Sequence, residues 1–281
     1  MSRGVAVVTD STAALTEPIR EQYDVHVVPL QVVLGSRVGA EGVDVTPADV
    51  AAALAARAPV STSRPSPQTF ADTYRRLAED GATSIVSVHL SARLSGTLEA
   101  AQLAAAEAPV PVHLVDSQST AMGLGFPVLA AAVTAAKTAA TTAVVAAAEK
   151  AIERTRVLFY VDSLDALRRG GRIGQAAALV GGALMVKPIL HVQDGRIGLL
   201  EKVRTATKAL DRLEDLAVDA AGPGAVDVAI HHLGAEARAE RMAQRLRARL
   251  RGLRSIHVSE VGAVVGAHVG VGLLGVVVHR R

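Results

Sequence analysis

The sequence predicts an α/β protein of two lobes. Short runs rich in Val and Ile alternate with longer Ala-rich stretches, which is typical of strands alternating with helices. Residues 1–155 are expected to form an N-terminal lobe with a mostly parallel sheet and flanking helices. A hairpin signal at Asp194-Gly195 indicates that the C-terminal lobe, residues 156–281, holds a mixed or antiparallel sheet covered by helices.

In the N-terminal lobe, β-branched runs predict four strands with helices between them. Two helices are expected to begin at Thr46-Pro47 and Ser66-Pro67, because a hydroxyl can cap backbone N–H groups and proline fits the first helical position. Residues 128–148 are mostly alanine and include Lys137, so they predict a helix of a soluble protein, with no stable membrane insertion. The four strands span residues 5–8, 25–34, 84–89 and 112–115.

In the C-terminal lobe, a strand and a short helix closed by Gly170-Gly171 come first. Two strands then flank Asp194-Gly195, and two amphipathic helices bracket a further strand before the last one. The expected strands are residues 157–161, 189–192, 197–203, 226–231 and 273–278, and the expected helices are residues 164–169, 206–220 and 235–251.

Composition excludes several kinds of chemistry. The chain has no cysteine, which rules out disulfides, thiolate catalysis and cysteine-bound zinc. Aromatic residues make up only 2%, which argues against stacking on single-stranded nucleic acid. The arginines from Arg245 to Arg254 predict a solvated helix face. No signal-peptide segment precedes Asp10, so we expect a cytoplasmic protein.

Two hydroxyl-rich segments are candidates for an anion site. In the segment from Thr62 to Pro67, Thr62 and Ser63 lie too early to cap the following helix and are free to face a cleft. In residues 91–97, Ser95 stands where a helix cap belongs, and Gly96 would let a ligand approach the backbone. The unpaired N–H groups at a helix start suit a carboxylate or phosphate, although capping alone would also explain Ser95.

A third candidate is the glycine-rich segment 262–272, which contains His268. A lone histidine in an apolar run can be a core residue or a functional one, and both interpretations stay open. The glycine spacing does not fit a dinucleotide fingerprint, and no P-loop, esterase elbow, zinc-protease or EF-hand motif occurs. We therefore expect no metal, no cofactor and no catalytic residue, only an anion-binding site on an α/β scaffold.

Eight short segments follow one another along nearly the whole chain, and as an ordered set they resemble the DegV family of bacterial lipid-binding proteins. No single segment is specific, but the order is. The segments are Thr9-Asp10-Ser11-Thr12, Thr62-Ser63-Arg64-Pro65-Ser66-Pro67, Leu94-Ser95-Gly96-Thr97, Asp116-Ser117, Leu167-Arg168-Arg169-Gly170-Gly171-Arg172-Ile173, Lys187-Pro188-Ile189-Leu190, Val203-Arg204-Thr205, and residues 262–272 around His268.

The resemblance implies a carrier that binds a long-chain fatty acid between two α/β lobes. It also implies a partner fatty acid kinase, which would phosphorylate the bound acid to an acyl-phosphate for phospholipid metabolism, so that the chain itself would not be an enzyme. Carried over, the carboxylate-binding residues are Thr62, Ser63, Ser95, Gly96 and His268, and the residues that would face the partner are Arg172 and Arg204.

Two departures from the family pattern stand close to these positions. Arg64 replaces a commoner glutamine, and Val271 replaces the usual proline after Gly270, which puts the shape of the His268 segment in question. Two other functions remain as alternatives. One is an enzyme that acts on a small carbonyl or phosphorylated ligand through His268. The other is a nucleic-acid-binding regulator that uses the Arg245–Arg254 stripe.

Overall fold

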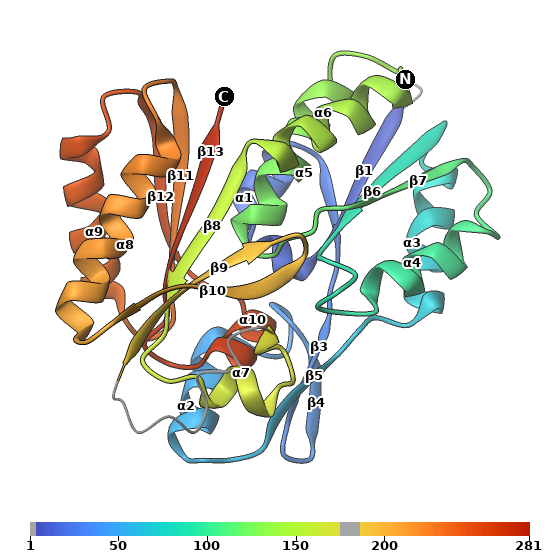
Figure 1. The fold of residues 1–281 in the computed structure, drawn as a ribbon. Helices are drawn as coiled ribbons and strands as arrows, with labels where there is room; N and C mark the ends of the chain where they lie inside the picture. The colour runs from blue at the N-terminus through green and yellow to red at the C-terminus, as the bar shows by residue number, and fades with distance from the viewer. Residues whose placement is uncertain (1–3, 175–185) are drawn as a thin grey trace.

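The protein, described by a computed structural model over residues 4–174 and 186–281, contains three β-sheets flanked by helices (Figure 1). The strands are β1 (Val5–Asp10), β2 (Val25–Val28), β3 (Gln31–Leu34), β4 (Arg37–Ala40), β5 (Val60–Ser63), β6 (Ser84–His89), β7 (Val112–Asp116), β8 (Thr155–Tyr160), β9 (Lys187–Gln193), β10 (Arg196–Val203), β11 (Val226–His232), β12 (Leu253–Glu260) and β13 (Leu274–Arg280). The helices are α1 (Glu17–Gln22), α2 (Pro47–Ala55), α3 (Pro67–Glu79), α4 (Thr97–Ala105), α5 (Met122–Ala135), α6 (Thr141–Glu153), α7 (Asp165–Arg169), α8 (Ala206–Ala221), α9 (Glu236–Arg249) and α10 (Ala263–Val269), with a 3-10 turn η1 (Ser11–Ala13) after β1.

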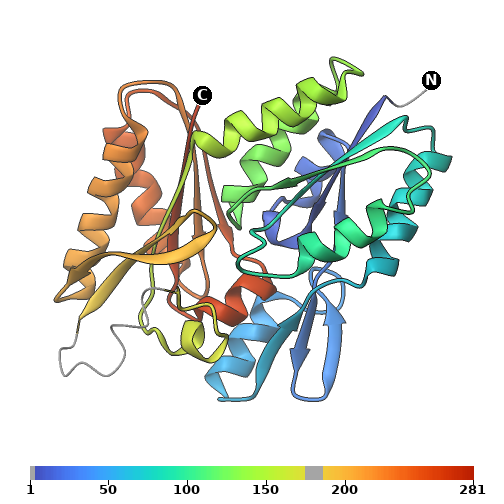
Figure 2. The same cartoon turned by 45° about the vertical axis from the view of Figure 1, so that its right-hand side comes forward.

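The first sheet is parallel throughout, in the order β2-β1-β6-β7. The six-stranded sheet has the order β10-β9-β8-β13-β11-β12, and only its β11–β12 pair is parallel. A small antiparallel sheet, β4-β3-β5, lies below both of them in Figure 2. The predicted fold class is confirmed, because a parallel sheet and a mixed sheet, both flanked by helices, are present.

Helix α5 lies between the two larger sheets. It packs on β1 and β6 of the parallel sheet and also contacts β8 and β13 of the six-stranded sheet. Met122 and Phe126 of α5 form an apolar cluster with Val157, Ala229 and Val277, whereas α8 and α9 pack against the six-stranded sheet from its other side. The side-chain contacts between α5 and the six-stranded sheet are therefore mainly apolar.

The strands of the six-stranded sheet all come from residues after Arg154, and the other two sheets use only earlier residues. Helix α10 nevertheless packs against α2 and β5. We propose the division into residues 1–155 and 156–281, which follows the sheets except that β8 begins at Thr155, with α10 packing across it.

Three predicted elements differ in the structure. Residues 25–34 are not one strand but β2 and β3, in different sheets, because Pro29 between them lacks the N–H that a continuous ladder requires. Residues 128–148 belong to two helices, α5 and α6. The glycine-rich segment after Gly262 forms helix α10, although glycine disfavours helices, and it does so packed against α2.

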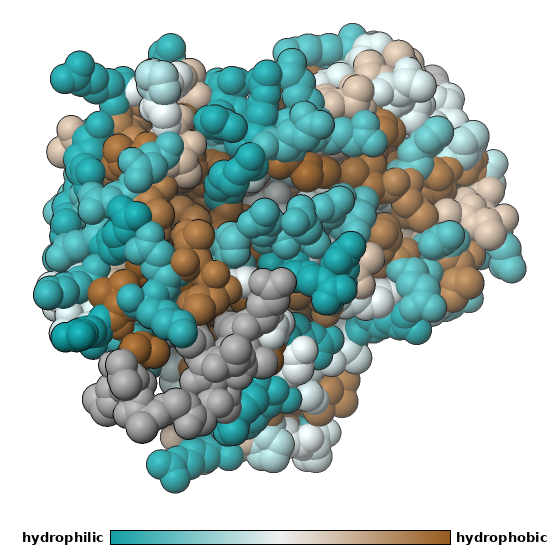
Figure 3. All heavy atoms as spheres, in the orientation of Figure 1, coloured by the Kyte–Doolittle hydropathy of each residue, from teal (hydrophilic) through white to brown (hydrophobic). Residues whose placement is uncertain are grey.

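The predicted helix starts at Thr46 and Ser66 are confirmed. The Thr46 hydroxyl accepts a hydrogen bond from Asp49 N, and the Ser66 hydroxyl accepts one from Thr69 N. None of the helices in the described part of the chain has the length and apolar character that a bilayer crossing requires. On the face shown in Figure 3, hydrophobic side chains show between hydrophilic ones.

Candidate functional site

A pocket of about 890 Å³, part of it open to solvent, lies where the three sheets meet. Its walls come from the loops after β1, β6 and β7, from β5, from α10 and from the six-stranded sheet. Loops at the carboxyl ends of parallel strands are where α/β sheets collect ligands, so the location agrees with the topology.

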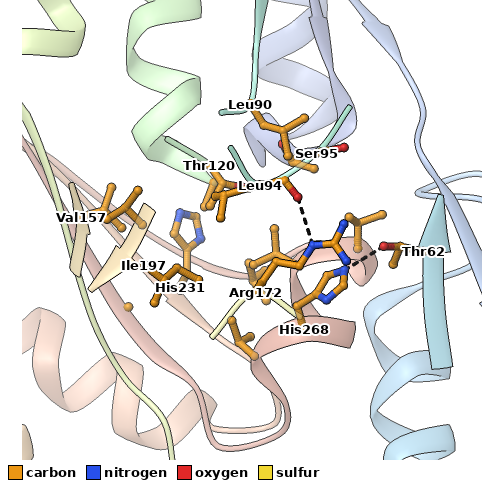
Figure 4. Close-up of a pocket in the computed structure, with 18 of the residues that line it drawn as sticks. Thr62, Leu90, Leu94, Ser95, Thr120, Val157, Arg172, Ile197, His231 and His268 are labelled. Carbon is orange, nitrogen blue, oxygen red and sulfur yellow. Dashed lines mark hydrogen bonds between the residues drawn. The ribbon is translucent and has the colours of Figure 1, made fainter. Parts of the chain in front are cut away.

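One end of the pocket is polar. Thr62 on β5 and His268 on α10 are 206 residues apart in sequence, yet Thr62 Oγ1 and His268 Nε2 form a hydrogen bond of 2.8 Å (Figure 4). Ser63, Ser95 and Arg172 line the same pocket. The structure therefore brings together most of the residues proposed from the sequence for the carboxylate.

Ser95 and Gly96 differ from the expected geometry in one respect. The helix cap of α4 is Gly96, not Ser95, and Ser95 Oγ instead forms a hydrogen bond of 2.9 Å with Thr97 Oγ1. Gly96 does not line the pocket, because the Arg64 side chain lies over it and donates to its carbonyl oxygen at 3.1 Å. Arg64 itself lines the pocket, but its guanidinium also forms an ion pair with Glu99 of α4, so the charge introduced by this departure from glutamine is largely balanced.

Arg172 lies inside the pocket. Its Nε donates to Leu94 O at 3.0 Å and its Nη1 donates to Gly170 O at 2.6 Å. These two bonds fix the guanidinium between the Ser95 loop and α7, facing His268 (Figure 4). Arg204 is exposed, follows β10 and does not line the pocket. The two arginines that the sequence analysis assigned to the partner-facing surface therefore differ: Arg172 lies in the pocket and Arg204 lies on the exposed surface.

The positive charge at the polar end comes mainly from Arg172. Burial, and then the nearby charge of Arg172, lower the pKa of His268 to about 4. His268 is thus neutral at pH 7, with one ring nitrogen protonated. Its Nδ1 has no hydrogen-bond partner among the described residues and packs against Gly170, where a side chain would overlap the ring. Only the Nε2 edge, towards Thr62, is available for polar contacts.

The rest of the pocket is lined mainly by aliphatic side chains, including Val157, Ile197 and Val277. Sequence analysis missed two polar residues there. His231 is buried and neutral, because burial and the neighbouring His232 lower its pKa to about 4, and it accepts a hydrogen bond from Met122 N at 3.3 Å. Thr120 stands at the start of α5. Neither carries a local signal, since strand alternation and loop composition do not reveal which cavity a residue faces.

Other basic residues are paired elsewhere. Arg245 and Arg249 of α9 form ion pairs with Asp211 and with Glu214 and Asp215 of α8. The arginines of the stripe are exposed, as predicted, but they do not share one helix face, because α9 ends at Arg249 and Arg254 lies on β12. Residues 4–174 and 186–281 contain no group of three or more histidine, aspartate or glutamate side chains placed to hold a metal.

The fold and the site define a class: α/β proteins with a largely apolar pocket, closed at one end by hydroxyls, a neutral imidazole and arginine. The chain belongs to the DegV family, since a family model described as "Uncharacterised protein, DegV family" matches residues 4–281. A DegV domain-containing protein of Streptomyces coelicolor is 58% identical over 281 residues, 100% of both chains.

Solved structures agree with this assignment. A DegV family protein from Thermus thermophilus, described by its fatty acid binding, has a TM-score of 0.93 at 33% identity, with 99% of each chain covered. DegV of Bacillus subtilis, described as a fatty acid binding protein, has a TM-score of 0.91 at 31% identity, with 100% of each chain covered.

Proposed function

We propose that this protein binds a long-chain fatty acid, with the carboxylate at the polar end of the pocket and the tail along its aliphatic walls. The observation that carries the proposal is the division of one pocket into a hydroxyl- and arginine-bearing end and an apolar remainder. The relatives described as fatty acid binding share this fold over nearly the whole chain, which supports the same ligand class here.

The residues can serve a carboxylate without an added cation. Ser95 Oγ and Thr62 Oγ1 would each donate to a carboxylate oxygen, while neutral His268 donates through Nε2–H to Thr62 and so orients its hydroxyl. Arg172 would supply the compensating positive charge. Ser63 joins this group as an exposed hydroxyl at the rim, and Gly96 would contribute through the loop that it shapes rather than by direct contact.

Tail and head contribute differently to affinity. Burying a C16 tail stabilises the complex by on the order of 11 kcal/mol gross, at about 0.8 kcal/mol per methylene. A charge-assisted hydrogen bond adds only about 1.5–3 kcal/mol. The tail would therefore determine affinity, and the polar end would determine which way the acid lies.

We further propose that the carboxylate is presented to a partner fatty acid kinase, which phosphorylates it to an acyl-phosphate. Ser63 and Arg64 are exposed, so the polar end is the part of the pocket that a partner could reach from outside. The alternative of an enzyme using His268 is less well supported, because an imidazole with a pKa of about 4 is a weak general base at neutral pH.

Mass spectrometry of an organic extract from gently purified protein tests the ligand class. We expect about one fatty acid per chain, and restoration of binding when delipidated protein is incubated with palmitate or oleate. A protein that yields no lipid and takes up neither acid would contradict the proposal. Formation of product from the isolated protein, without any partner, would favour the enzyme alternative.

A further inference from the structure

Helix α10 carries His268 and is held at both ends by the small β4-β3-β5 sheet and the residue that follows β4. At its last turn, His268 Nε2 bonds Thr62 of β5 at 2.8 Å. At its first turn, Val264 N donates to Glu41 Oε1 at 2.7 Å, across 223 residues of sequence. Glu41 directly follows β4, and its own N–H donates to Leu30 O at 2.9 Å, which ties it to the same region.

Glu41 is an unusual residue at this position. It is only 7% exposed, and none of the ion pairs formed by the described residues includes it. Its second oxygen, Oε2, is buried without a hydrogen-bond partner. Burial raises the pKa of Glu41, and the Asp10 carboxylate raises it further, while Ser11 and Val264 N–H lower it. Burying a poorly paired carboxyl lowers the free energy of unfolding. The contact between Glu41 and α10 is a structural role that could offset this cost.

The surroundings of Glu41 are shaped for this contact. A Cβ at Gly262, the N-cap residue of α10, would overlap Glu41 Oε1, so glycine there is what lets the carboxyl reach Val264 N. A local Ser or Asp cap would hold the helix end equally well but would not connect it to the small sheet. The hydrogen bond from Val264 N to Glu41 therefore fixes the position of α10 relative to the small sheet, in addition to stabilising its helical conformation.

We propose that Glu41 is a positioning residue of the head-group site, acting through α10 to hold His268 against Thr62. Val264 and His268 are four residues apart and face the same pocket, so a shift of the first turn moves the ring as well. Glu41 itself does not line that pocket, and its effect on a ligand is therefore indirect. The ligand part of this inference rests on the proposed fatty acid binding, and the positioning of the ring does not.

Two measurements on four variants test the inference. NMR titration of the His268 imidazole in lipid-free protein reports how the ring is held. The ratio of palmitate to hexadecanol affinity reports how well the head group is recognised, because the two ligands share a tail. The variants are Glu41→Gln, which keeps an acceptor oxygen, Glu41→Asp, which keeps the charge but shortens the reach, Glu41→Ala, and Asp227→Ala as the matched control. Asp227 is also a buried carboxylate, but it bonds Arg281 and Ser255 away from the pocket.

Wild-type protein and Glu41→Gln should titrate His268 near a pKa of 4 and keep the palmitate preference. Glu41→Asp and Glu41→Ala should raise that pKa by about one unit or more, as the ring becomes hydrated, and should lower the preference about fivefold. Asp227→Ala should lower the melting temperature and change neither reading. If Glu41→Ala does not fold, Glu41→Asp decides.

The inference would be overturned if a folded Glu41→Asp or Glu41→Ala variant kept both the wild-type pKa of His268 and the wild-type ratio of palmitate to hexadecanol affinity. It would also be overturned if Glu41→Gln and Glu41→Ala lowered that ratio equally. Failure of the proposed function gives a different result. The protein would then bind no palmitate, while the titration would still show whether Glu41 holds the ring.

Discussion

Of the two ring nitrogens of His268, Nε2 faces the pocket and Nδ1 is buried. Nε2 bonds Thr62 Oγ1, whereas Nδ1 packs on Gly170. Glutamine can place an amide nitrogen about where Nε2 lies, and asparagine is one methylene shorter. The two substitutions therefore distinguish the need for a donor at that point from the need for an imidazole.

We expect fatty acid affinity to fall in the order wild type, His268→Gln, His268→Asn, His268→Ala. The alanine variant should be worst, because it leaves Thr62 without its donor in a poorly hydrated site. Calorimetry with palmitate gives the order. Equal and complete loss in all three variants would instead indicate acid–base or covalent chemistry that only an imidazole performs.

Ser95→Ala and Thr62→Ala should each weaken fatty acid binding by roughly tenfold to a hundredfold, the effect of one lost charge-assisted bond. The reaction with a partner kinase should fall further, because the carboxylate also loses its orientation. Ser66→Ala is a suitable control, since Ser66 caps α3 and should alter stability rather than affinity. Unchanged affinity in the Ser95 and Thr62 double variant would place the carboxylate elsewhere.

At the scale of elements, the β9–β10 hairpin also helps to build the pocket. Gly195 has a φ of +74°, and its carbonyl oxygen accepts from Ser91 Oγ at 2.8 Å. This bond ties the hairpin to the loop that carries Ser95. A Cβ at residue 195 would overlap the Ser91 hydroxyl.

Gly195→Ala should therefore lower the free energy of unfolding by about 1–3 kcal/mol, through both the backbone strain and the displaced hydroxyl. Asp194→Gly at the neighbouring position is the control, because Asp194 has a φ of +49° that glycine adopts without strain. Urea unfolding of the two variants measures the difference. Equal stability in both would show that the turn tolerates a side chain at 195.

The sequence pattern predicted those elements whose signals are local. Strand β6 matches the predicted residues 84–89, and α8 extends the predicted helix 206–220 by one residue. Strands β4, β5 and β12 and helix α10 were missed. Their residues are mixed or glycine-rich, so pairing and packing with distant elements decide their structure. Thr62 and His268 were candidates from their local segments, and the resemblance assigned both to the carboxylate, whereas no local pattern links Glu41 to Val264.

At the scale of the whole molecule, one buried histidine, His231, and one largely buried histidine, His268, make stability depend on pH. Burial lowers the pKa of both His231 and His268 to about 4 in the folded protein, against about 6.5 when unfolded. Between these values the unfolded chain binds more protons, so the free energy of unfolding falls as pH is lowered from about 6.5 towards 4.

For fully buried His231 the expected loss is on the order of 3 kcal/mol at pH 4. Thermal unfolding at several pH values, compared with His231→Gln, measures it. The variant should be less stable near pH 7, since a buried bond is altered, but it should lose less on acidification. Parallel curves for the two proteins would contradict the assignment to His231.

Recognition by a partner is also a property of the whole surface. We expect Arg204→Glu to weaken coupling to a fatty acid kinase while leaving lipid affinity unchanged, because Arg204 is exposed and does not line the pocket. Arg172→Glu should reduce both, since Arg172 lies within the pocket. Normal phosphorylation of lipid carried by Arg204→Glu at low kinase concentration would show that residue 204 does not contribute.

The pocket walls come from the six-stranded sheet, from β5 of the small sheet and from the loops that follow the parallel strands. A bound acyl chain would therefore contact all three parts of the fold at once. Occupancy then adds to folding stability by mass action, about 2.7 kcal/mol when free ligand is a hundredfold above its dissociation constant. Protein without bound lipid would unfold more often and would therefore be degraded faster. The abundance of the carrier would thus follow the supply of its cargo, without a separate sensor.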